Sequence, residues 1–245
     1  MKNVFFFLAV LSVPALQCAG VLPDATLHSP PAALLRVAEP DKWSAGIAYE
    51  REHRQIDIVN PEDLEASRLG VFITHSPLPW LVLEAGAGTA IADLGNSEGN
   101  YGFDWRGGIK IGLLEHVLEQ SPVRGTIQLF RLDIGSDYRR ARSNFSDADF
   151  FWQEWRFMPS VTYVERLDTS RGPRRLHPES TAIHFGMVFS RIHGRHGGVS
   201  ISENRNFGLR AGGDIRFISH WTAFADILAY HASETSLRAG LRRQF

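Results

Sequence analysis

The residues of this chain that could do chemistry are charged side chains spaced two apart along extended stretches. Acids and bases alternate with apolar neighbours, so each stretch would present its charges on one face. Both signs are interspersed, which predicts a salt-bridged interior that fills and stabilises the fold. Because Arg and Lys slightly outnumber the acids, the alternative is a narrow, weakly anion-preferring pore. The inward-facing candidates are Glu50, Glu52, Arg68, Glu84, Asp104, Arg106, Lys110, Arg124, Glu154, Arg156, His184, Arg210, Asp214, Arg216, Asp226, Arg238 and Arg242.

The elements that must position these charges are β-strands with one apolar face. Residues 101–113 alternate most cleanly, with Phe103, Trp105 and Ile109 opposite Asp104 and Arg106. Three more such stretches fill residues 207–245. A polar inner face and a continuous apolar outer face are typical of a barrel with lipid outside. The alternative, a secreted soluble β-barrel that binds an apolar ligand, requires Phe103, Trp105 and Ile109 to point inward.

The last stretch carries a family resemblance. Leu237, Ala239, Leu241 and Phe245 share one face, and Phe245 is the C-terminal residue. In this feature the chain resembles the outer-membrane β-barrel proteins of Gram-negative bacteria, from whose pattern it departs at Arg243. The resemblance implies that Phe245 is an assembly signal read by the barrel assembly machinery. It also implies outer-membrane lipid and lipopolysaccharide as partners, and leaves room for a small solute or a surface ligand.

The expected connections give a count of about ten strands, with eight or twelve left open. Residues 76–79, which include Pro77, and residues 218–220 are expected to form short periplasmic turns. Residues 135–151 and 193–205 are expected to be polar loops on the outer side. A one-residue bulge near Phe130 is needed to keep Ile127 and Leu129 on the face of Leu132. The link at residues 168–179 is longer than a periplasmic turn should be.

The N-terminus and the composition set the remaining limits. Residues 1–20 read as a secretory signal peptide, residues 21–42 as a periplasmic lead-in and residues 43–245 as the barrel. The only cysteine, Cys18, would leave with the signal, so no disulfide is expected. A formal net charge of −1 gives no reason to expect nucleic acid as a partner. The mean hydropathy of −0.15 argues against a bundle of transmembrane helices.

One short motif suggests an enzymatic alternative. Histidine can act as a base for a nearby serine hydroxyl, and His231 and Ser233 resemble the His-x-Ser element of outer-membrane lipid A deacylases, although Glu234 stands where that family has Asn. An omptin-like protease would instead use acids such as Asp93, Asp147 and Asp149 in the outer loops. No metal-binding signature occurs, and neither a metal nor a cofactor is expected.

The sequence therefore predicts an all-β protein with a single antiparallel transmembrane β-barrel in the outer membrane. Its expected role is structural, surface-interacting or that of a narrow pore, and it is not expected to be an enzyme. The alternatives are a rim-active hydrolase and the soluble ligand-binding barrel.

Overall fold

The computed structural model describes residues 42–57, 61–95, 97–121, 126–146, 149–167, 178–203, 206–217, 219–231 and 234–245. The predicted signal peptide and all of the lead-in but Lys42 lie outside these residues. The strands are β1 (Lys42–Asp57), β2 (Pro61–Leu78), β3 (Leu81–Leu94), β4 (Gly102–Ser121), β5 (Thr126–Asn144), β6 (Asp149–Leu167), β7 (Pro178–His196), β8 (Val199–Glu203), β9 (Phe207–Phe217), β10 (Trp221–Ala229) and β11 (Thr235–Gln244). No helix among the described residues is long and apolar enough to cross a membrane.

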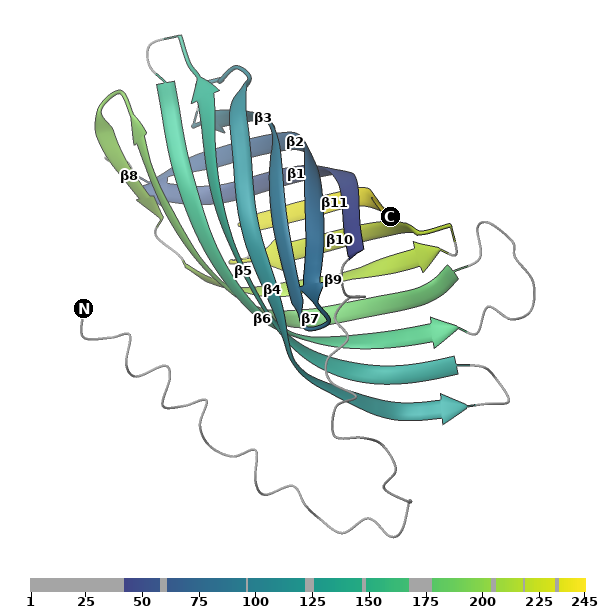
Figure 1. Ribbon diagram of the computed structural model, residues 1–245. Helices are drawn as coiled ribbons and strands as arrows, with labels where there is room; N and C mark the ends of the chain where they lie inside the picture. Colours follow the sequence, from purple (N-terminus) through teal and green to yellow (C-terminus); the bar gives the residue numbers. More distant parts are fainter. Residues whose placement is uncertain are drawn as a thin grey trace. The chain divides into compact units, whose positions relative to one another are not determined.

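The sheet closes on itself. Each long strand pairs antiparallel with its neighbours, and β11 pairs with β1 through a register that sets Ser44 opposite Gln244. Ten strands, β1 to β7 and β9 to β11, complete the barrel (Figure 1). Its predicted fold class and strand count are confirmed. Lys42 and Gln244 lie at the same end, which we call the terminal end, and the other end is called the hairpin end.

The remaining strand, β8, changes the barrel at the hairpin end. β7 pairs with β9 as far as Phe189 and then with β8, where His193 lies opposite Ser202. In the same way, β1 pairs with β11 and then, at Ile56 and Asp57, with β8. β8 therefore takes the place of the three short strands β9, β10 and β11. The wall has ten strands near the termini and eight at the hairpin end, where the barrel is correspondingly narrower.

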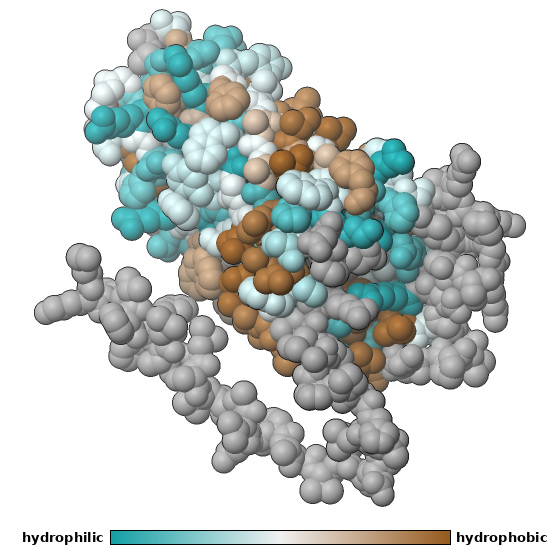
Figure 2. All heavy atoms as spheres, viewed as in Figure 1, coloured by the Kyte–Doolittle hydropathy of each residue, from teal (hydrophilic) through white to brown (hydrophobic). Residues whose placement is uncertain are grey.

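The outer surface of the barrel carries an apolar band. Large side chains such as Ile47, Val71, Val161 and Leu209 are 48 to 62% exposed. The apolar band crosses the middle of the barrel, and hydrophilic side chains cover the upper left part of the barrel, towards β8 (Figures 1 and 2). Phe103, Trp105 and Ile109, which the soluble alternative needs inside, lie outside and are 58, 39 and 39% exposed. That requirement of the soluble barrel is not met.

Several expected loops are strands. Most of residues 135–151, predicted as a polar insertion, belong to strands: residues 135–144 end β5, residues 149–151 begin β6, and the two strands pair as far as Asn144 and Asp149. Residues 193–205 contain the end of β7 and all of β8. The prediction failed because it took a run of charges to mean a loop, whereas strands that extend beyond the apolar band carry charges on their outer face.

One local prediction was shifted and one was wrong. The short turn expected at residues 76–79 lies at Pro79 and Trp80. Pro77 belongs to β2 and lies in an irregularity of the pairing between His75 and Leu78, where a missing N–H is tolerated. The bulge expected near Phe130 falls on the partner strand β4, next to Leu114 and next to Glu119. Leu129 is therefore buried while Phe130 and Leu132 are exposed. Most of residues 168–179 lie outside the described residues.

Candidate functional site

The interior of the barrel is the candidate site, and it consists of three layers. At the hairpin end an apolar core closes the lumen, with Trp152 stacked on Phe150 at a centroid distance of 4.8 Å. None of its members exceeds 4% exposure. The core contains Ile56, Leu64, Ala66, Ala90, Ala92, Leu94, Ala141, Phe150, Trp152, Ile192 and Ile201. An apolar core inside a hydrophilic outer surface is the arrangement of a water-soluble protein, and the hairpin end of the barrel has both.

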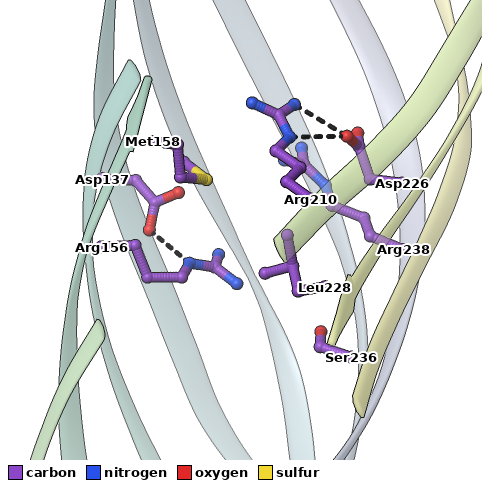
Figure 3. A pocket seen from close by; sticks show the side chains of 8 residues that line it. All are labelled: Asp137, Arg156, Met158, Arg210, Asp226, Leu228, Ser236 and Arg238. Atoms are coloured by element: carbon purple, nitrogen blue, oxygen red, sulfur yellow. Dashed lines mark hydrogen bonds and ion pairs between the residues drawn. The ribbon is translucent and has the colours of Figure 1, made fainter. Parts of the chain in front are cut away.

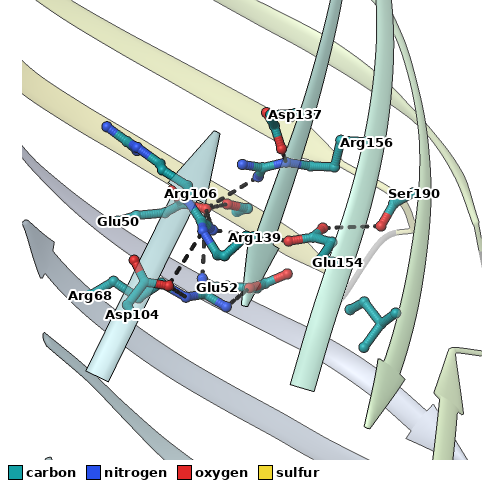
Figure 4. Close-up of polar contacts among 12 residues, drawn as sticks. Glu50, Glu52, Arg68, Asp104, Arg106, Asp137, Arg139, Glu154, Arg156 and Ser190 are labelled. Carbon is teal, nitrogen blue, oxygen red and sulfur yellow. Dashed lines mark hydrogen bonds and ion pairs between the residues drawn. The ribbon is translucent and has the colours of Figure 1, made fainter. Parts of the chain in front are cut away.

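The second layer, in the middle of the barrel, is built around Glu50. Its carboxylate accepts two hydrogen bonds from Arg139, of 2.7 and 2.6 Å, and a third from Arg156, of 3.2 Å. Arg68 lies 3.6 Å from Glu50 and 2.6 Å from Glu52. Figure 4 shows how these side chains converge from separate strands on one point in the lumen. Charges removed from water to this degree must be paired, and here they are.

Arg54 joins this layer to the apolar core. Its side chain is fully buried, forms an ion pair with Glu203 of β8, and lies 3.6 to 3.8 Å from three further carboxylates. These belong to Glu52, Glu154 and Glu234. The guanidinium carbon also lies 3.3 Å from the centre of the Tyr230 ring, a cation–π contact. One arginine thus connects β1, β6, β8 and the turn between β10 and β11.

The third layer lies nearer the terminal end and is partly exposed. Asp226 lies 2.6 Å from His184 and 2.7 Å from Arg210, and Glu84 contacts Arg106 and Arg238 at 3.1 and 3.0 Å. Asp133 holds Lys110 at 3.2 Å and Arg131 at 2.8 Å. The Lys110 side chain is 34% exposed. This layer is therefore more exposed to water than the central layer, in which Glu50, Arg68 and Arg139 are at most 3% exposed.

A small cavity lies between the second and third layers (Figure 3). Its volume is about 30 Å³, room for one or two water molecules and too little for a substrate. It is lined by Asp137, Arg156, Met158, Arg210, Asp226, Leu228, Ser236 and Arg238.

The structure places the charged residues singled out from the sequence as follows. Glu50, Glu52, Arg68, Asp104, Glu154 and Arg156 lie in the central layer. Glu84, Arg106, Lys110, His184, Arg210, Asp226 and Arg238 lie in the third layer. Arg216 pairs with Glu179 at 3.1 Å. Asp214 is half-buried on the side of β9 that carries Arg210, and Arg242 is half-buried on the side of β11 that carries Arg238. Arg124 lies outside the described residues.

Sequence reasoning missed several central residues. Arg139 falls in the run predicted as a loop, and Arg54 is not among the inward-facing candidates, yet both are fully buried in the lumen. Asp137, which hydrogen bonds Arg156 at 2.8 Å, had been placed in the same loop. The period-two spacing of Asp137, Arg139 and Ala141 was the available signal, because it continues the alternation of the strand before it.

The residues of the enzymatic alternative are not brought together in the described part of the chain. His231 is exposed, while Glu234 is buried near Arg54. Asp149 forms an ion pair with Arg142 at 2.5 Å on the outer face. Ser233 and Asp147 lie outside the described residues. Phe245 is 67% exposed at the terminal end, and its backbone N–H donates to the Trp43 carbonyl at 2.9 Å.

No protein-family model and no curated protein matches the chain. Among solved structures it is similar to the translocator domain of the autotransporter NalP from Neisseria meningitidis, with 10% identity, 86% of this chain and 91% of the other covered, and a TM-score of 0.36. The COG4313 outer membrane channel from Pseudomonas putida F1 is 9% identical, with 89% of this chain and 99% of the other covered and a TM-score of 0.39. The outer membrane protease OmpT from Escherichia coli is 12% identical, with 84% of this chain and 97% of the other covered and a TM-score of 0.36. The barrel itself is established by its own strand pairing and exposed apolar band.

Proposed function

We propose that this chain is an outer-membrane β-barrel with a closed lumen, whose role is structural or surface-interacting rather than that of a pore. One observation carries the proposal. The hairpin end is filled by an apolar core in which Ile56, Leu64 and Phe150 have no exposed surface and Trp152 has 1%. A conducting path needs a continuous column of water, and a close-packed apolar core excludes it.

The proposed orientation follows from the two ends of the barrel. An even number of strands puts both ends of the barrel on the same side of the membrane, and we assign this terminal end to the periplasm, where outer-membrane barrels have their short turns. The hairpin end rises above the membrane, because its outer surface carries the exposed ion pairs Arg51–Glu65 and Arg142–Asp149. An exported precursor would be inserted by the barrel assembly machinery through β11 and Phe245, and its outer surface would contact lipopolysaccharide.

A non-enzymatic role is favoured by the state of the lumen carboxylates. Glu50, Asp226 and Asp133 each lie within 3.2 Å of an arginine or lysine nitrogen. A carboxylate held by such partners is a poor general base, because proton uptake would break its ion pair. These groups therefore act as links between strands.

The test is a conductance measurement on folded protein. Purified barrel with heat-dependent mobility on gels is inserted into planar bilayers, with a general porin as the positive control. We expect the folded protein to insert and to give no stable conductance steps. Reproducible steps that scale with salt concentration would overturn the proposal, and recovery of the protein from the soluble periplasm would overturn its placement in the membrane.

A further inference from the structure

The outer face of β5, β6 and β7 changes from apolar to cationic within one or two residues. On β7 the exposed run Phe185, Met187 and Phe189 is followed by the exposed Arg191 and Arg195. On β5 the exposed Arg140 and Arg142 follow Tyr138. In a membrane barrel this border is where lipid headgroups lie.

The register places these arginines on both sides of β6. Neighbouring strands lie about 4.8 Å apart, so β5 and β7 are about 10 Å apart. Long guanidinium side chains from both strands can therefore reach one group that lies over β6. The three rows across β5, β6 and β7 are Tyr138–Trp155–Arg191, Arg140–Gln153–His193 and Arg142–Phe151–Arg195.

The positive charge of this surface is largely uncompensated. Within the described residues, Arg142 pairs with Asp149, while Arg140, Arg191 and Arg195 have no ion pair. The matching position on β1 differs, because Arg51, the first exposed charge above Tyr49, pairs with Glu65 at 3.3 Å. The first exposed charge above the aromatic residues of β1 is thus neutralised, whereas three of the four arginines on β5 and β7 are not.

We propose that Arg140, Arg142, Arg191 and Arg195, here called the arginine face, bind the phosphate groups of a phosphorylated glycolipid in the outer leaflet. Guanidinium groups bind phosphate oxygens in pairs. The acyl chains of the same lipid would lie on Trp155, Phe157 and Phe189 directly below, which are 56, 37 and 36% exposed. This apolar surface favours a lipid over a soluble polyanion, which would leave it uncovered. The inference rests on the membrane placement proposed above.

The experiment compares phosphorylated with dephosphorylated lipid. Folded protein in detergent micelles is titrated with bisphosphorylated lipid A and with the same lipid after removal of its phosphates, and binding is measured by native mass spectrometry. The test variant carries Arg140→Gln, Arg191→Gln and Arg195→Gln. The matched control carries Arg51→Gln and Arg243→Gln, which also remove exposed arginines but lie on β1 and β11.

We expect the wild-type protein and the control to bind the phosphorylated lipid at least about tenfold more tightly than the dephosphorylated one, and the test variant to lose this preference. A test variant that keeps the preference, or a wild-type protein without one, would overturn the inference. So would competition by heparin with equal strength, because it would indicate a face for soluble polyanions. Heat-dependent mobility on gels checks that each variant is folded. If the triple variant does not fold, the double variant with Arg191→Gln and Arg195→Gln takes its place in the titration.

The two proposals fail separately. A folded, non-conducting barrel without phosphate preference would overturn only the lipid site. A conducting barrel that retains the preference would overturn only the closed lumen.

Discussion

Arg139 and Glu50 meet in the lumen through two parallel hydrogen bonds, of 2.7 and 2.6 Å, although their strands β5 and β1 are not neighbours in the sheet. Neither side chain is more than 3% exposed. Hydrogen bonds between adjacent strands close the wall of a barrel, but they cannot resist its flattening. Contacts across the lumen can, so this pair and its neighbours hold the cross-section of the barrel.

This relationship predicts strong coupling between the two residues. Replacing either one by a neutral residue of similar size, as in Glu50→Gln or Arg139→Gln, takes from a buried charge its closest partner and leaves it only the more distant ones, Arg156 and Arg68 for Glu50 or Asp104 and Glu154 for Arg139. Each replacement should cost up to about 3–5 kcal/mol of unfolding free energy. The double variant Glu50→Gln/Arg139→Gln should cost less than the sum of the two. The measurement is urea unfolding in detergent micelles. Arg51→Gln, at an exposed ion pair, is the control and should cost less than about 1 kcal/mol. Strictly additive single and double variants would contradict the coupling.

Arg54 should govern the order of the hairpin end. Arg54→Met removes the cation that Glu203 and Glu234 share, and repulsion among the remaining carboxylates should loosen β8 from β1. We expect faster proteolysis at residues 199–203 and faster hydrogen exchange of the same segment, with the ten-stranded part unchanged.

The control for Arg54→Met is Arg142→Met, which removes an exposed arginine with one ion-pair partner, Asp149. Equal protection of β8 in both variants and in the wild-type protein would show that Arg54 does not hold the strand.

Gly212 leaves the space in which His184 and Asp226 meet. A Cβ atom at this position would lie 2.6 Å from His184 Nε2 and 2.8 Å from Asp226 Oδ1, too close for either. The Cβ would also lie 2.5 Å from the Ala225 backbone oxygen of the neighbouring strand. Gly212→Ala should therefore push this pair and the β10 backbone away and lower the unfolding free energy by about 1–3 kcal/mol. At Gly107 the nearest atom to an added Cβ is 3.9 Å away, so Gly107→Ala is the matched control.

The stability of the two glycine variants can be measured by urea unfolding, and the His184–Asp226 contact by NMR chemical shifts of the His184 ring. A loss of stability in the Gly107 variant as large as that in the Gly212 variant would mean that the strand, and not the His184–Asp226 contact, is affected.

Phe245 should matter for assembly more than for stability. Its ring is exposed, while its backbone N–H already bonds to Trp43, so Phe245→Ala removes no buried contact. We expect less folded barrel in the outer membrane of cells, and refolding into micelles at the rate and stability of the wild-type protein. Normal assembly of Phe245→Ala in cells would show that Phe245 is not an assembly signal. Failure of the variant to refold in vitro would show that Phe245 is needed for the stability of the barrel.

The sequence by itself determined the wall of this protein. Period-two alternation around Phe103, Asp104 and Trp105 sets which side chains face out, and the number of such stretches gives about ten strands with eight or twelve left open, because both depend only on neighbours along the chain. The three-dimensional structure alone decided what fills the lumen. Arg139 lies in a charged run that reads as a loop, and Arg54 lies in the charged end of the first strand. Their partners Glu50 and Glu203 come from strands that are distant in the sequence. Which charges meet across a barrel depends on the stagger of its strands, and no single strand contains that stagger. The eight-stranded hairpin end, where β8 replaces three strands, arises in the same way, since it requires the lengths of β9, β10 and β11 and the pairing of β8 with β1 to be known together.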